Sequence, residues 1–252
     1  MTGRRRARPG AARSLRAAAR PLPGRLRAVV TDVDGTLTDE DRRLDPRAVA
    51  WVRRLEERGI PVVLATGNVL PIALALHRFL ALSGPIVAEN GGVICTFRSG
   101  RERVERLADR KVAERAFRTL RRAGLPVRRL FTDRWRESEV ALEPNVSVSA
   151  IRQHLGRAPV LVESTGFALH LMETDAGKLP ALERALAPLG LGPSACVVLG
   201  DGDNDVEMLR AAGFGVSFPS ASRRARAAAR YVTRARFGRG FVEGLKASHI
   251  LG

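Results

Sequence analysis

Two aspartates, Asp32 and Asp34, stand at the end of an apolar run, Ala28–Thr31. Strand interiors rarely hold acidic residues, so carboxylates at this position suggest a chemical task. A second acidic segment, Asp201–Asp205, reads DGDND and follows another apolar run, Cys196–Leu199. If both runs are parallel strands, their carboxyl ends meet at one edge of the sheet, where α/β proteins bind ligands. The spacing therefore predicts a cluster of carboxylates at that edge.

Uncharged polar residues and one lysine belong to the same predicted edge. Thr66, Gly67 and Asn68 follow the apolar run 60–65. Lys178 begins a predicted helix that leads toward Cys196–Leu199, and it is the only lysine between positions 112 and 245. Because the chain otherwise prefers arginine, a lysine here indicates a need for a compact charge with rotatable donors.

Four aspartates at one sheet edge, Asp32, Asp34, Asp201 and Asp205, repel one another, so the cluster requires a cation. Two like charges about 4 Å apart repel by about 4 kcal/mol at an effective dielectric constant of ~20. Oxygen ligands suit a hard ion, and Mg²⁺ commonly takes a few carboxylates, waters and a substrate phosphate. Lys178 and nearby backbone amides would then balance phosphate charge. The residue types favour phosphoryl transfer with Mg²⁺ as the cofactor.

Four ordered segments of the chain resemble the motifs of the haloacid dehalogenase (HAD) superfamily of phosphatases. They are DVDGTLT (32–38), ATGN (65–68), Lys178 and GDGDND (200–205). The stretch between the second and third motifs resembles the α/β cap of the branch that acts on small phosphate esters. Within that branch, the segments DVDGTLTDEDRRLD (32–45), GIPVVLATGNVLP (59–71), SGPIVAENGGVI (83–94) and GFALHLME (166–173) resemble the archaeal-type phosphoglycolate phosphatases. The resemblance begins near Arg27 and runs to the C-terminus.

The resemblance implies a role for each matching residue. Asp32 would be the nucleophile that attacks phosphorus and forms an aspartyl-phosphate. Asp34 would protonate the leaving alkoxide and then activate water for hydrolysis. The metal would be held by Asp32, Asp34 (through its main-chain carbonyl), Asp201 and Asp205, and the phosphoryl group would be bound by Thr66, Gly67, Lys178 and Asn204. The implied activity is hydrolysis of 2-phosphoglycolate to glycolate, and the alternative is hydrolysis of other small sugar phosphates.

The chain departs from the resembling sequences at one site residue. A glycine often follows the lysine of the third motif in those sequences, whereas here Gly177 precedes Lys178. The different position of the glycine could displace the lysine side chain. We nevertheless expect Lys178 to reach the aspartates at the sheet edge.

The order of predicted elements indicates an α/β fold, with a Rossmann-like parallel-sheet HAD core and an inserted α+β cap. Apolar strand-like runs and amphipathic helices alternate up to residue 90, and the alternation resumes after residue 173. We expect residues 25–90 and 174–252 to form the core and residues 91–173, which include a hairpin at 93–107, to form the cap. Residues 1–24 are rich in arginine, alanine, glycine and proline, which predicts a disordered basic extension.

The formal net charge of +17 comes mainly from two short segments. Residues 1–27 hold nine arginines and residues 219–242 hold seven, with no acidic residue in either segment. A polyanion-binding protein is therefore an alternative of another class. No aromatic ladder accompanies these arginines, so we expect no specific nucleic-acid partner.

The remaining expectations concern location and partners. No apolar run reaches the length that spans a membrane, and Cys95 and Cys196 lie in separate apolar runs, as buried thiols in a reducing compartment would. We expect a cytoplasmic protein whose partner is a small phosphorylated acid or sugar. The sequence does not determine the oligomeric state, and a homodimer is one possibility.

Overall fold

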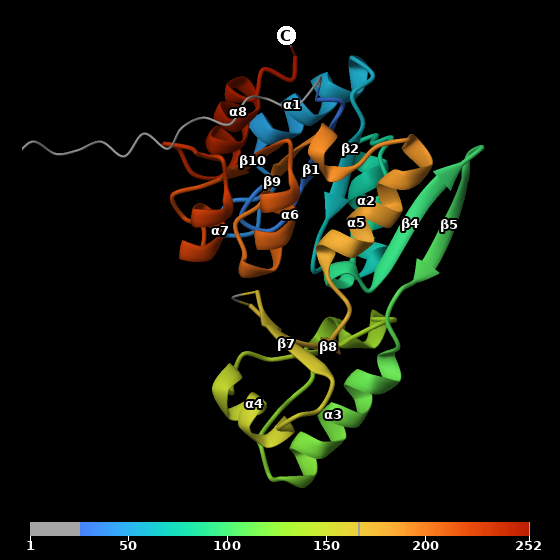
Figure 1. Ribbon diagram of the computed structural model, residues 1–252, viewed down its shortest axis with the longest axis vertical. Helices are drawn as coiled ribbons and strands as arrows, with labels where there is room; N and C mark the ends of the chain where they lie inside the picture. The colour runs from blue at the N-terminus through green and yellow to red at the C-terminus, as the bar shows by residue number, and fades with distance from the viewer. Residues whose placement is uncertain (1–25, 166, 252) are drawn as a thin grey trace, which may run out of the picture.

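The computed structural model of the chain describes residues 26–165 and 167–251 (Figure 1). The predicted extension at residues 1–24 lies outside these residues. The described chain forms a large core and a smaller unit that lies below it in Figure 1, so that the two units face each other.

The core is built on a mixed sheet, which has eight strands within the described residues, in the order β11-β10-β9-β1-β2-β3-β4-β5. All strands from β11 to β3 run parallel, and β4 and β5 run antiparallel. The strands are β1 (Ala28–Thr31), β2 (Val62–Ala65), β3 (Ile86–Ala88), β4 (Val93–Arg98), β5 (Arg101–Arg106), β9 (Cys196–Leu199), β10 (Phe214–Ser217) and β11 (Tyr231–Val232). This parallel α/β arrangement confirms the predicted fold class.

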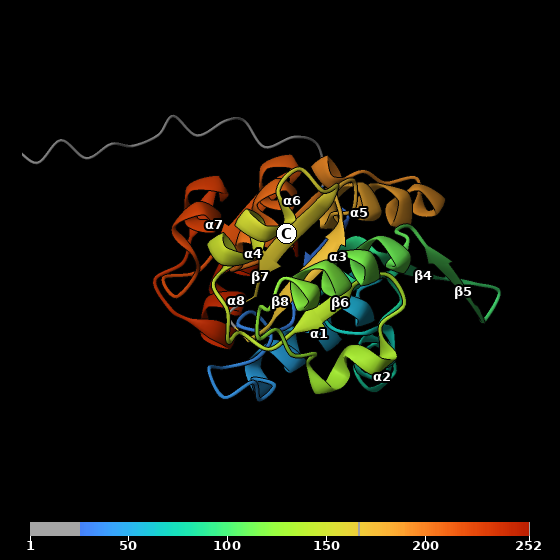
Figure 2. The ribbon, with the colours of Figure 1, turned by 90° about the horizontal axis from the view of Figure 1, so that it is seen from below.

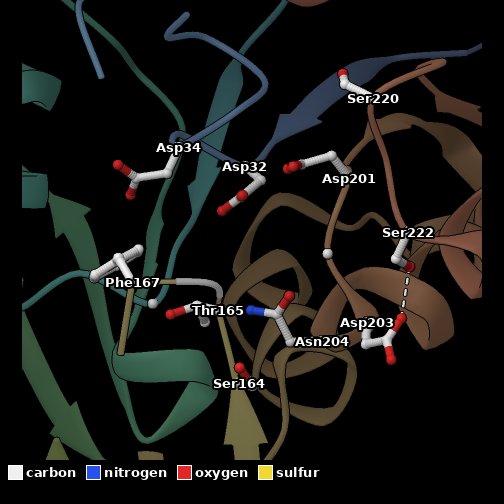
Figure 3. A pocket seen from close by; sticks show the side chains of 12 residues that line it. Asp32, Asp34, Ser164, Thr165, Phe167, Asp201, Asp203, Asn204, Ser220 and Ser222 are labelled. Atoms are coloured by element: carbon white, nitrogen blue, oxygen red, sulfur yellow. Dashed lines mark hydrogen bonds between the residues drawn. The ribbon is translucent and has the colours of Figure 1, made fainter. Parts of the chain in front are cut away.

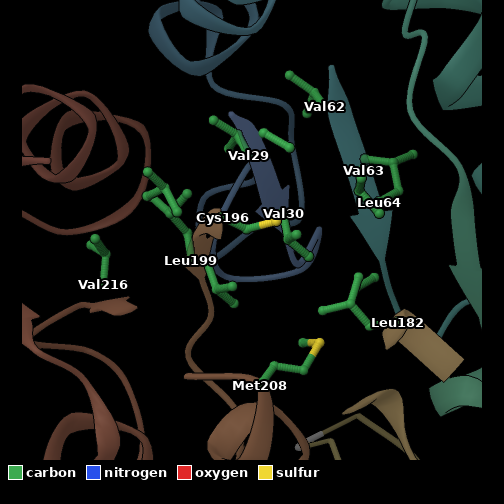
Figure 4. Packing of buried hydrophobic residues seen from close by; sticks show 14 of the residues in the cluster. Val29, Val30, Val62, Val63, Leu64, Leu182, Cys196, Leu199, Met208 and Val216 are labelled. Carbon is green, nitrogen blue, oxygen red and sulfur yellow. The ribbon is translucent and has the colours of Figure 1, made fainter. Parts of the chain in front are cut away.

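Helices cover both faces of the large sheet, which explains the continuous apolar strands. Every residue of β1, β2 and β9 is buried, as expected for parallel strands covered on both sides. Helices α1 (Pro46–Glu57), α2 (Leu70–Phe79) and α8 (Phe237–Ala247) lie on one face, and α5 (Lys178–Leu186) and α6 (Val206–Ala211) lie on the other (Figure 2). Figure 4 shows Leu182 of α5 and Met208 of α6 in the cluster of strand valines and leucines.

Helix α1 illustrates how local signals set these elements. Asp45 precedes the helix and its side chain accepts a hydrogen bond from the backbone N–H of Arg47, while Pro46 occupies the first turn. Both features fit a helix start. Val52 and Leu55 are buried against the sheet, so the predicted apolar face is confirmed.

The smaller unit has its own sheet and its own hydrophobic core. In the described chain this sheet has three antiparallel strands in the order β6-β8-β7, namely β6 (Val140–Leu142), β8 (Leu169–Glu173) and β7 (Val160–Ser164). Helices α3 (Arg110–Arg122) and α4 (Val148–Leu155) pack on the side away from the core (Figure 1). Leu120, Ile151 and Leu171 lie in its apolar cluster. The sheet of the smaller unit therefore lies between these helices and the core (Figure 1).

The hairpin that we expected within the cap segment 91–173 is hydrogen-bonded to the core sheet instead. Strand β4 pairs with β3, and Val93, Ile94 and Cys95 are buried there. The alternation of strands and helices stops after β3, so the sequence suggests that an insert begins there. In the structure the core sheet continues through β4 and β5, which are antiparallel. Between this hairpin and β6, Arg129 forms an isolated bridge to Leu142, and a 3₁₀ turn, Phe131–Trp135, follows.

No helix within residues 26–165 and 167–251 is long and apolar enough to cross a membrane.

Candidate active site

Three neighbouring strands of the core deliver the predicted motifs to one edge. Strand β1 lies between β9 and β2, with Thr31 paired to Leu199 on one side and to Leu64 on the other. Asp32 therefore emerges beside the loop that begins at Gly200 and near Thr66, which follows β2. The predicted meeting of the motifs at the sheet edge is borne out by this register.

Asp32, Asp201 and Asp205 form a compact acidic group. One carboxylate oxygen from each lies within 4.8 Å of the others. Asp205 is fully buried and Asp32 is 7% exposed. Figure 3 shows the side chains of Asp32 and Asp201 directed into the same space. Asp34, which was predicted to hold the metal through its main-chain carbonyl, does not place its carboxylate in this group.

Lys178 bridges two members of the acidic group. Its buried ammonium donates hydrogen bonds to Asp32 Oδ1 at 3.0 Å and to Asp205 Oδ1 at 2.7 Å. Burial alone would lower the pKa of Lys178, but Asp205 and Asp32 outweigh burial and raise that pKa above its usual value. Gly177 caps the start of α5, so the glycine before the lysine does not carry the ammonium away from the aspartates.

One lysine does not neutralise three carboxylates, of which those of Asp32 and Asp205 are buried and that of Asp201 is half-buried. Burial raises the pKa of Asp32 well above its usual value; Lys178 opposes this shift, while Asp205 and Asp201 add to it. Burial and the charge of Asp205 raise the pKa of Asp201 to about 7. A cation would relieve this repulsion, and a donor set made only of carboxylates suits a hard divalent ion. The acidic group therefore fits a metal ion.

Asp34 is held apart from the acidic group by two neighbours. Asn68 Nδ2 donates to Asp34 Oδ2 at 2.6 Å, and Arg42 Nε lies 3.4 Å from Asp34 Oδ1. The Thr66 hydroxyl accepts hydrogen bonds from the Asn68 backbone N–H at 3.0 Å and from Asn68 Nδ2 at 3.3 Å. Thr66 thus positions Asn68, which positions Asp34. Sequence reasoning gave Asn68 and Arg42 no role, although both lie in the quoted motifs.

A cavity of about 380 Å³ opens beside these residues, between the core and the smaller unit (Figure 3). The core contributes Asp32, Asp34, Gly67, Asp201, Gly202, Asp203, Asn204, Ser220 and Ser222, and the β7–β8 segment contributes Ser164, Thr165 and Phe167. Of the predicted site residues, Thr66, Lys178 and Asp205 do not line the cavity and lie behind those that do. The volume suits a small ligand.

Gly35 is required between the two acidic loops. Its φ is +76°, and a Cβ at this position would lie 2.4 Å from Asp201 Oδ2. We expect Gly35→Ala to displace Asp201 and lower hydrolytic activity by about 100-fold, as a misplacement of roughly 1 Å can do. Activity and thermal unfolding of the purified variant would test this.

Gly59→Ala is the matched control, because Gly59 has a φ of +71° with no atom within 4 Å of the added Cβ. It carries only the backbone penalty of about 1 kcal/mol. Equal activity loss in both variants would contradict the steric argument.

A buried chain of polar side chains joins the core motifs to the smaller unit. Asn204 Nδ2 donates to Asn90 Oδ1 at 2.9 Å, and Asn90 Nδ2 donates to Glu139 Oε2 at 3.2 Å. Glu139 Oε1 also accepts from Arg136, whose Nη1 donates to the Gly67 carbonyl at 3.0 Å. Asn90 therefore lies between Asn204 of the core and Glu139 of the smaller unit.

His170 continues this polar chain toward the cavity. Its Nδ1 lies 2.9 Å from Glu139 Oε1 and its Nε2 lies 3.0 Å from the hydroxyl of Thr165. A carboxylate only accepts, so Nδ1–H donates to Glu139 and Nε2 accepts from Thr165. His170 is not among the predicted site residues. The signal for it in the sequence is its place between Leu169 and Leu171 in β8.

Burial and the charge of Arg136 lower the pKa of His170 to about 3. The unfolded chain takes up a proton near pH 6.5 and the folded chain does not, so stability is complete above pH 6.5 and is lost as pH falls toward 3. We expect His170→Gln to reduce this loss by up to about 1.4 kcal/mol per pH unit. Denaturant unfolding between pH 7 and 4 would measure it, with exposed His154→Gln as the control. Parallel pH curves for the wild type and His170→Gln would contradict the assignment.

Comparison with protein families decides the identity of the fold and motifs. A family model described as haloacid dehalogenase-like hydrolase matches residues 29–136 and 140–243, which include every predicted site residue. The chain belongs to the haloacid dehalogenase-like hydrolases. The predicted superfamily is therefore confirmed, and this HAD hydrolase has its acidic group where the motifs were expected.

Archaeal proteins are similar to this HAD hydrolase over nearly their whole length. A phosphoglycolate phosphatase of Methanothermobacter thermautotrophicus is 39% identical, covering 88% of this chain and 98% of that protein. A phosphoglycolate phosphatase of Methanoculleus marisnigri is 40% identical, covering 88% and 96%. A crystal structure of a Thermoplasma acidophilum protein superimposes with a TM-score of 0.80 at 25% identity, covering 90% of this chain and 99% of that one. The predicted resemblance to the archaeal-type phosphatases is confirmed.

Proposed function

We propose that this HAD hydrolase is a Mg²⁺-dependent phosphomonoester hydrolase that converts 2-phosphoglycolate to glycolate. The observation that carries the proposal is the similarity to archaeal phosphoglycolate phosphatases over 96–98% of their length. The acidic group and the small cavity support the same chemistry. Hydrolysis of other small sugar phosphates is the alternative.

Asp32 acts as the nucleophile in this proposal. Lys178 fixes Asp32 Oδ1, whereas Asp32 Oδ2 accepts no hydrogen bond from residues 26–165 or 167–251. Oδ2 is thus the free oxygen for attack on phosphorus, and an aspartyl-phosphate forms as the alkoxide leaves. Lys178 and Asn204 lie where they can offset charge on the phosphoryl oxygens, and Gly67 lines the same cavity.

Asp34 transfers the protons. Because Asn68 fixes Asp34 Oδ2, the carboxyl group is oriented at the edge of the cavity without joining the acidic group. It gives a proton to the leaving alkoxide and then takes one from the water that hydrolyses the aspartyl-phosphate. Thr66 contributes by holding Asn68.

Asp32, Asp201 and Asp205 would hold the Mg²⁺, together with the main-chain carbonyl of Asp34 that the family resemblance implies. When bound, the ion neutralises charge on the phosphoryl group and on the carboxylates. Burial and then the charge of Asp205 raise the pKa of Asp201 to about 7, and such an ion would relieve the repulsion by Asp205. We place the reaction in the cytoplasm, which suits the buried, unpaired Cys95 and Cys196.

A panel of phosphate esters tests the proposal. Purified protein should release phosphate from 2-phosphoglycolate with Mg²⁺ and lose this activity with a chelator. Activity on sugar phosphates but none on 2-phosphoglycolate would support the alternative. Absence of activity on every ester with Mg²⁺ would overturn the phosphatase itself.

A further inference from the structure

We propose that Arg42 binds the carboxylate of the leaving group and so selects small phosphorylated acids over neutral esters of the same size. This inference rests on the proposed function, because it concerns the group that departs from phosphorus. Arg42 lies in the loop between β1 and α1, outside the motif residues to which a role was assigned.

Two contacts place Arg42 beside the proton-transfer residue and the wall of the cavity. Arg42 Nε lies 3.4 Å from Asp34 Oδ1, and the guanidinium carbon lies 4.4 Å from the centre of the Phe167 ring. Asp34 and Phe167 both line the cavity and lie on the same side of it in Figure 3. Arg42 therefore spans the core and the β7–β8 segment at this side of the cavity.

The backbone around Arg42 is arranged to hold it there. Its φ is +63°, a conformation uncommon for a residue with a side chain. Asp39 stabilises the turn, since its carboxylate accepts from the backbone N–H groups of Asp41 and Arg43 at 3.0 and 2.9 Å, and its carbonyl accepts from the N–H of Arg42 at 3.0 Å. A strained residue that its neighbours hold in place often marks a functional position.

The guanidinium of Arg42 retains donors for a ligand. Its Nη1 and Nη2 groups make no hydrogen bond or ion pair with the part of the chain that the structure describes. A guanidinium presents paired N–H groups that match the two oxygens of a carboxylate. Other cations near the cavity are engaged, among them Lys178 with Asp32 and Asp205, Arg136 with Glu139, and Arg224 with Asp203 at 3.2 Å.

The position of Asp34 sets where the leaving group lies. In the proposed reaction Asp34 protonates the ester oxygen, so that oxygen must lie within hydrogen-bond reach of its carboxyl group. In 2-phosphoglycolate a single methylene separates this oxygen from the carboxylate. The carboxylate therefore falls next to Arg42, on the side of the cavity away from Asp203.

The test compares two esters that differ only in the group that Arg42 would meet. 2-Phosphoglycolate ends in a carboxylate, and 2-hydroxyethyl phosphate ends in a neutral hydroxymethyl group. Loss of the contact with Asp34 lowers kcat/KM for both esters in Arg42→Ala, so the readout is the difference between them. We expect kcat/KM for 2-phosphoglycolate to fall about 10- to 100-fold further than kcat/KM for 2-hydroxyethyl phosphate, with the additional loss mainly in KM. Arg42→Lys should fall in between for the acid, because it keeps the charge and loses the paired donors.

Arg43→Ala is the matched control, because Arg43 is the adjacent residue and pairs with exposed Asp41 at 3.4 Å. It should leave both substrates unchanged. An equal loss on both substrates in Arg42→Ala would overturn the proposal, because it would mean that Arg42 only positions Asp34 or Phe167. Equal wild-type kcat/KM for the two esters would also overturn it while leaving the phosphatase intact. If the wild type hydrolyses neither ester, the proposed function fails first.

Discussion

We expect Asp32→Asn to abolish phosphate release, with kcat lower by on the order of 10⁴-fold or more, because an amide cannot form the covalent intermediate. The same variant should unfold at an equal or higher temperature than the wild type when no metal is added. Burial and the carboxylates of Asp205 and Asp201 disfavour the ionised form of Asp32 and raise its pKa. An uncharged asparagine removes that repulsion.

Phosphate release with 2-phosphoglycolate and Mg²⁺, and thermal unfolding without Mg²⁺, would measure the two effects. Asp41→Asn is the matched control, because it removes the same charge from the loop between β1 and α1. Asp41 pairs there with Arg43. It should keep full activity. Retention of more than about a hundredth of the activity in Asp32→Asn would exclude Asp32 as the nucleophile.

The second large effect concerns Lys178, and its stability change has the opposite sign. Lys178→Met leaves the buried Asp32 and Asp205 without their ammonium partner. Breaking a buried ion pair from one side costs about 3–5 kcal/mol. We therefore expect a lower unfolding temperature, partial recovery on addition of Mg²⁺, and activity reduced by about 10²- to 10³-fold through lost stabilisation of phosphoryl charge.

Lys111→Met provides the control, because Lys111 is an exposed lysine in the first turn of α3. It should change neither stability nor activity by a measurable amount. If Lys178→Met were as stable as the wild type without metal, the acidic group would be protonated rather than charged, and the argument for a cation would fail. The contrast between a stabilised Asp32→Asn and a destabilised Lys178→Met is the most direct test of the electrostatics of this site.

Strand runs and motif residues were readable from the sequence because their signals are local. Ala28–Thr31 and Cys196–Leu199 are continuous apolar runs of a kind that buried parallel strands favour. Asp45 and Pro46 mark the start of α1 by capping chemistry. The domain boundary was less readable, because the β4–β5 hairpin joins the core sheet through β3, and pairing between strands is not a local property.

The supporting contacts of the site were beyond reach of the sequence. Asn68 contacts Asp34 because β1 and β2 are neighbours in the sheet. Arg42 contacts Asp34 because the loop between β1 and α1 turns back toward the end of β1. Glu139 directly precedes β6 and His170 lies in β8, and Glu139 joins His170 to Asn90 of the core. Asn68 lies 34 residues from Asp34, and Glu139 lies 49 residues from Asn90 and 31 from His170. No spacing rule connects such partners.

The sequence by itself determined which residues are the candidates for the chemistry: the aspartates, the lysine and the glycine-rich loops appear in an order that identifies the superfamily. Only the tertiary structure decided how they differ. It grouped Asp32 with Asp201 and Asp205, set Asp34 apart with Asn68 and Arg42, and closed the cavity with Phe167. The physical reason is that residue type fixes what a side chain can do, whereas burial and neighbouring charge fix what it does at a given place.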